Sequence, residues 1–93
     1  MVDLSGREYK FLQMICAQTG GDVSRIVVSG RLNQLAGTNG FDEQDVFHIS
    51  NLLYKLELLI MRAREGEKTA AGANVVECVK LTSRGREYVQ SLE

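Results

Sequence analysis

The sequence predicts a mainly helical α+β domain with one small β-hairpin, in the order helix, strand, helix, helix, strand, strand, helix. Three observations carry this prediction. Apolar residues make up 44% of the 93 residues and charged residues 25%, as in ordinary globular domains. The chain contains no proline that would interrupt a helix. Apolar residues recur at helical spacing in the first two thirds and alternate later, as in strands. The length allows one domain, assigned to residues 1–93.

The first half of the chain predicts two helices and a short strand. Ser5 and Glu8 fit a capping box, and Gly20-Gly21 is a stop signal, so the first helix is expected over residues 5–19. The β-branched residues within 25–28 predict a brief strand. Ser29 can cap a second helix over about residues 30–36, and a glycine-containing turn follows.

The third helix is predicted to be the longest, over about residues 42–59. Asp42 can cap it, and an apolar stripe runs along one face. In a domain this small the helical stripes must share one core. We therefore expect one cluster of buried residues: Leu12, Ile15, Leu35, Ile49, Leu53 and Leu56.

The last third predicts a hairpin and a final helix. Residues 60–65 alternate apolar and polar side chains, residues 67–74 are small and polar, and residues 75–81 form a second apolar run. The hairpin is therefore expected over about residues 60–81. Thr82 or Ser83 then begins a last helix over about residues 82–93.

Two segments resemble bacterial transcriptional regulators. Residues 49–60 read Ile-Ser-Asn-Leu-Leu-Tyr-Lys-Leu-Glu-Leu-Leu-Ile, similar to the end of the recognition helix in MarR-like and PadR-like proteins. Residues 80–87 read Lys-Leu-Thr-Ser-Arg-Gly-Arg-Glu, similar to the segment with which those families leave the second wing strand. With the element order, these segments resemble a winged helix-turn-helix domain. The resemblance implies a DNA-binding regulator that acts as a homodimer.

The same resemblance implies the residues that contact DNA. The third helix would enter the major groove, and the hairpin, as the wing, would contact the backbone. Asparagine can pair with adenine, and serine, tyrosine and lysine can hold phosphates. Arginine and lysine on the hairpin can also hold phosphates. The expected DNA contacts are Ser50, Asn51, Tyr54, Lys55, Arg62, Arg64, Lys68 and Arg84.

Other interpretations of these residues remain open. The outer face of the third helix could be simply solvated, and the hairpin charges could serve to block edge pairing. Alternatively, Phe47, Tyr54 and Leu58 form an apolar stripe for a protein partner, an interpretation that the acidic start of the helix favours. On the first helix, Phe11 and Met14 lie off the main stripe and predict a homodimer, formed through the first helix, the last helix or both.

Composition excludes several classes of protein. A net charge of -1 argues against nucleic-acid binding by bulk charge. Cys16, Cys78 and His48 are too few and too scattered for a zinc site, and both cysteines are expected either to pack in the core or to sense redox state. The chain shows no catalytic constellation, so we expect no enzyme, cofactor or metal. No apolar run is long enough for a membrane span and no signal segment is evident, so a cytoplasmic protein is expected.

Overall fold

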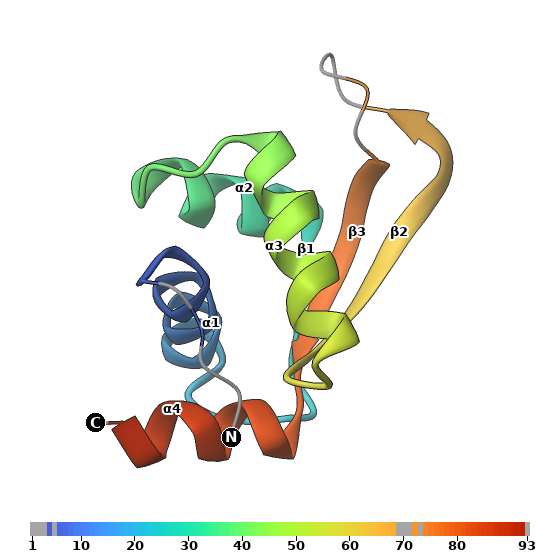
Figure 1. The fold of residues 1–93 in the computed structure, drawn as a ribbon. Helices are drawn as coiled ribbons and strands as arrows, with labels where there is room; N and C mark the ends of the chain where they lie inside the picture. Colours follow the sequence, from blue (N-terminus) through green and yellow to red (C-terminus); the bar gives the residue numbers. More distant parts are fainter. Residues whose placement is uncertain (1–3, 5, 69–71, 73, 93) are drawn as a thin grey trace.

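The computed structural model describes residues 4, 6–68, 72 and 74–92, and it confirms an α+β fold (Figure 1). Four helices accompany a three-stranded antiparallel sheet in these residues. The elements follow the predicted order: α1 Gly6–Thr19, β1 Ile26–Val28, α2 Ser29–Thr38, α3 Glu43–Lys55, β2 Leu59–Lys68, β3 Asn74–Leu81 and α4 Ser83–Leu92.

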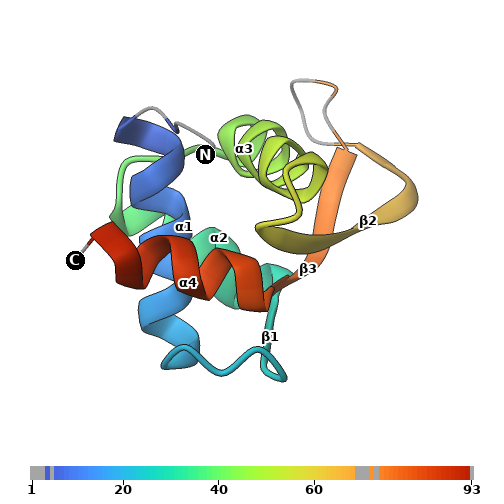
Figure 2. The ribbon, with the colours of Figure 1, turned by 60° about the horizontal axis from the view of Figure 1, so that its bottom comes forward.

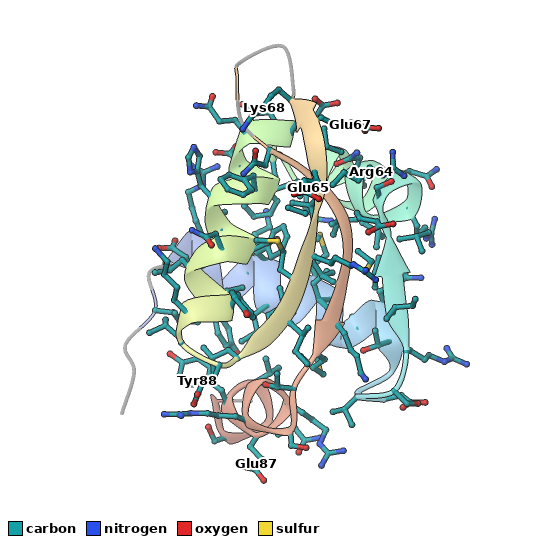
Figure 3. All side chains as sticks on the ribbon, turned by 90° about the vertical axis from the view of Figure 1, so that its right-hand side faces the viewer. Arg64, Glu65, Glu67, Lys68, Glu87 and Tyr88 are labelled. Carbon is teal, nitrogen blue, oxygen red and sulfur yellow. The ribbon has the colours of Figure 1, made fainter. Side chains whose placement is uncertain are left out.

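The sheet has the strand order β1-β3-β2, so the hairpin of β2 and β3 is extended by the short first strand. Ile26 pairs with Lys80, and Leu59 pairs with Leu81 at the base of the hairpin. The far end of the hairpin pairs Lys68 with Asn74. Figure 3 views the sheet from the side that carries no helix, with α1 and α2 behind it. The far end of the hairpin projects away from α4 (Figure 1).

The predicted core is confirmed. Leu12, Ile15, Ile49 and Leu53 are buried, and the two remaining members, Leu35 and Leu56, are half-buried against the same cluster. Residues from both strands of the hairpin complete the core. They include Leu59, Val76, Val79 and Leu81.

The expectation that Phe11 and Met14 form a second surface is wrong. Both side chains are buried, and the Phe11 ring meets the Phe41 ring edge-to-face with centroids 5.5 Å apart. The physical reason is that α1 lies at the centre of the fold and contacts α3, α4, β1 and β3. A central helix buries more than one stripe within its own chain. The homodimer prediction therefore loses the surface that motivated it.

The two cysteines are half-buried, and Cys16 packs against the core, in line with a packing role. Cys78 pairs with both Val28 and Arg62 across the sheet. His48 is exposed on α3, and its ring lies 5.4 Å from that of Phe47.

Thr82 and Gly85 join the start of α4 to the turn after α3. The Thr82 hydroxyl accepts a hydrogen bond from the Gly85 amide at 2.9 Å, so Thr82 caps α4 as expected. The same hydroxyl donates to the Glu57 carbonyl oxygen at 2.7 Å. Gly85 lies so close that an added Cβ would be 2.0 Å from the Leu58 carbonyl oxygen. Only glycine allows this approach of helix to turn.

Candidate nucleic-acid interface

Acidic residues at the start of α3 cap the helix. The Asp42 side chain accepts from the Asp45 amide at 2.8 Å, and the Asp45 side chain accepts from the Asp42 amide at 3.1 Å. These reciprocal bonds satisfy amides that the first turn leaves open. Arg7 of α1 adds an ion pair to Asp45 at 2.8 Å. The hydrogen bond from the Asp42 amide, helped by Arg7, lowers the pKa of Asp45 below its ordinary value of 3.8. The carboxylates therefore fix the start of the helix and its position on α1.

The end of α3 lies four residues earlier than predicted, at Lys55. Glu57 adopts a left-handed conformation with φ 63°, which reverses the chain. The Leu58 amide then donates to the Leu53 carbonyl at 2.9 Å, and the Glu57 amide donates to the Tyr54 carbonyl at 3.0 Å. This is the Schellman arrangement, in which glycine is the usual left-handed residue. The reversal points Leu58 into the core.

The predicted outward positions of Leu58 and Ser50 are therefore wrong. Leu58 is 1% exposed, so it is no part of an outer apolar stripe. Ser50 is fully buried rather than facing a groove, and its hydroxyl has no hydrogen-bond partner among the described residues. Ser50 follows Val46 by four residues and precedes Leu53 by three, so it falls on the buried stripe. This spacing can be read from the sequence, but serine is polar, so Ser50 was assigned to the outer face.

The remaining outer face of α3 retains four of the predicted residues. Lys55 is exposed, Tyr54 is 50% exposed, and Asn51 and Phe47 are half-buried. Leu52, which the sequence argument missed, is also exposed at 38%. The outer face is therefore mixed in chemistry, with one cation near its end.

The hairpin cations are exposed and paired with neighbouring groups on or beside the hairpin. Arg62 lies 3.5 Å from Glu77 on β3, with 78% of its side chain exposed. Arg64 lies 3.4 Å from Glu67 and 3.4 Å from the Ser29 hydroxyl. Lys68 donates to the Asn74 amide oxygen. Figure 3 shows Arg64, Glu65, Glu67 and Lys68 gathered toward the far end of the hairpin. Positive and negative side chains are thus interspersed along this hairpin.

Arg84 lies near the base of the hairpin, at the opposite end from Lys68. Its guanidinium is 3.0 Å from the Glu57 carboxylate, beside the base of the hairpin. Lys68 pairs with Asn74 at the far end. The structure therefore places Arg62, Arg64 and Lys68 on the hairpin itself, whereas Arg84 lies on α4 beside the hairpin base.

The described residues offer neither a metal-ligand cluster nor a membrane-spanning helix. They contain no group of three or more histidine, cysteine, aspartate or glutamate side chains that could hold a metal ion. None of their helices combines the length and apolar character that crossing a bilayer requires. No family model, curated protein or solved structure matches this chain.

Proposed function

We propose that this chain is a winged-helix module that binds double-stranded DNA as a small transcriptional regulator, with α3 in the major groove and the hairpin on the backbone. The element order and the β1-β3-β2 sheet support the winged-helix assignment. The observation that carries the proposal is the projecting hairpin with its exposed cations. Figure 2 shows the hairpin beside α3, which packs on the same sheet.

Residue roles follow from exposure. Arg62, Arg64 and Lys68 hold phosphates along the hairpin, and Lys55 adds a phosphate contact from the end of α3. Asn51 faces base edges. Ser50 has no role in the proposal, because it is buried.

The ion pairs on the hairpin do not prevent this binding. Exposed pairs are worth only about 0–1 kcal/mol, so an arginine can exchange a carboxylate for a phosphate at little cost. The carboxylates nevertheless repel the DNA backbone. The proposal therefore expects weak non-specific binding that falls steeply as salt increases.

Fluorescence anisotropy of a labelled duplex of mixed sequence, titrated at several salt concentrations, tests the proposal. Arg62→Ala should weaken binding to all sequences and lower the salt slope by about 1. Arg25→Ala is the matched control, since Arg25 is similarly exposed, with 68% of its side chain accessible, but precedes β1 near the hairpin base. Glu77→Gln, which releases Arg62, should tighten binding. Equal affinities for Arg62→Ala and the parent protein would remove the hairpin from the interface.

Protein association is the second candidate function. Tyr54 exposes apolar surface on the outer face of α3, and Phe47 lies half-buried on the same side of the helix. Leu52 is also exposed, at another edge of that face. A parent protein that shows no salt-dependent binding to any duplex would favour this candidate over DNA binding.

A further inference from the structure

Strand β1 is an edge strand that contains no lysine or proline. Among the described residues it pairs only with β3, and its residues Ile26 and Val28 are 58% and 54% exposed. Edge strands offer unpaired backbone amides and carbonyls, which natural proteins commonly guard with lysine or proline within the strand. The three residues of β1 are all β-branched and apolar. Its outer edge is therefore suited to pairing with another extended segment.

A groove of about 260 Å³ lies beside this strand. It is lined by all three β1 residues, by Gln18 and Thr19 at the end of α1, and by Arg25 and Arg31. A second groove of about 400 Å³ shares Gln18 and continues between α1 and α2, past Lys10 to Asn39. An extended chain paired with β1 could therefore place side chains in both grooves, which meet at Gln18.

The charged side chains that line these grooves are all positive. Their linings contain Arg25, Arg31 and Lys10 but no aspartate or glutamate. Arg31 donates to two amide oxygens, of Gln34 at 3.0 Å and of Gln18 at 3.4 Å. Lys10 donates to the Asn39 carbonyl at 3.2 Å.

Arg25 has one carboxylate within ion-pair distance. That carboxylate is Asp22, at 4.0 Å and outside the lining. Its other oxygen accepts from the Ser24 amide and hydroxyl at 2.9 and 2.6 Å, and these bonds lower the pKa of Asp22. The positive charge of the groove is therefore much less compensated than that of the hairpin.

We propose that this groove binds an extended acidic segment of a partner polypeptide, which adds to the sheet as a strand beside β1. Backbone hydrogen bonds to β1 supply affinity, and carboxylates on alternate residues meet Arg25 and Arg31. A second copy of this chain is a poor occupant, because pairing β1 with itself would bring the arginines of both copies to one seam. A DNA duplex lacks the backbone amides and carbonyls that the strand edge requires. The proposal is independent of DNA binding by the hairpin.

The test uses a fluorescein-labelled peptide of alternating glutamate and valine, with binding followed by anisotropy. Arg31→Ala and Arg25→Ala should each weaken binding about two- to fivefold, the range expected for losing one exposed ion pair. Arg62→Ala is the matched control and should bind like the parent protein. Circular dichroism verifies that each variant folds.

Two further probes separate the mechanism from simple charge attraction. The same peptide carrying N-methyl groups on alternate amides cannot complete a strand ladder and should lose binding, and a lysine–valine peptide should not bind. Amide shifts in the nuclear magnetic resonance spectrum should centre on residues 25–31 with the parent peptide.

Several outcomes would overturn the proposal: no binding of the acidic peptide, equal binding of its N-methylated form, or an unchanged affinity in Arg31→Ala. Weaker duplex binding in Arg25→Ala and Arg31→Ala would instead assign the groove to DNA. Because Arg62→Ala affects only duplex binding if both proposals hold, the failure of one is distinguishable from the failure of the other.

Discussion

Replacing Gly85 with alanine is expected to destabilise the fold, whereas the same change at Gly37 of α2 is expected to stabilise it. A Cβ at Gly85 would lie 2.0 Å from the Leu58 carbonyl oxygen, 3.0 Å from its carbon and 3.2 Å from a Leu81 methyl carbon. The first two atoms are backbone and cannot move aside as a flexible side chain could. Helix α4 must therefore shift, and the shift would stretch the 2.9 Å bond between the Gly85 amide and the Thr82 hydroxyl.

The magnitude follows from two opposing effects. Alanine in place of glycine within a helix gains about 0.5–1 kcal/mol. Overpacking costs about 1–3 kcal/mol, and a weakened cap costs about 1 kcal/mol more. The net loss should be about 1–3 kcal/mol. In a chain of this size each kcal/mol lowers the Tm by about 4–8 °C.

Urea and thermal unfolding followed by circular dichroism measure this effect. Gly37→Ala is the matched control, since Gly37 lies within α2 and an added Cβ there would meet nothing within 4 Å. That variant should gain about 0.5–1 kcal/mol. If Gly85→Ala were as stable as Gly37→Ala, the close approach of α4 to the turn after α3 would be refuted.

Three further predictions concern α3 and its ends. Ser50→Ala should raise the free energy of unfolding by about 1 kcal/mol, because it removes a buried hydroxyl without a partner among the described residues; a lower urea midpoint would contradict this. Glu57→Gly should be more stable than Glu57→Ala by about 1 kcal/mol, since both lose the ion pair with Arg84 but only glycine adopts φ 63° without strain; equal midpoints would refute the strain. Asp45 has a folded pKa below its ordinary value, so it stabilises the fold above pH 3.8 and that stability is lost as pH falls through the folded pKa. Asp45→Asn should accordingly lose less stability than the parent protein between about pH 5 and pH 2, and parallel curves would argue against the capping box.

The helical spacing of apolar residues predicted which positions of the helices are buried. Ile49 and Leu53 recur at helical spacing with Leu12 and Ile15 on another helix, and all four are buried. The end of α3 was not predictable in this way. Its left-handed residue is Glu57, where glycine would have marked the stop, so the pattern continued into a turn.

The candidate site was harder to predict because exposure depends on tertiary packing. Phe11 and Met14 were expected to be exposed because α1 was assumed to pack through one face only. Ser50 was assigned outward by its polarity, although its position lies on the core stripe. The groove beside β1 has no sequence signal, since it forms where the end of α1, a three-residue strand and the start of α2 meet.

Hydrogen–deuterium exchange of the protein with and without duplex DNA at low salt tests the central proposal most directly. Binding by α3 and the hairpin predicts slower exchange in residues 51–55 and 59–68, with residues 25–31 unchanged. Protection confined to residues 25–31, or no protection in any segment at saturating duplex, would contradict the proposal that α3 and the hairpin form the DNA-binding face.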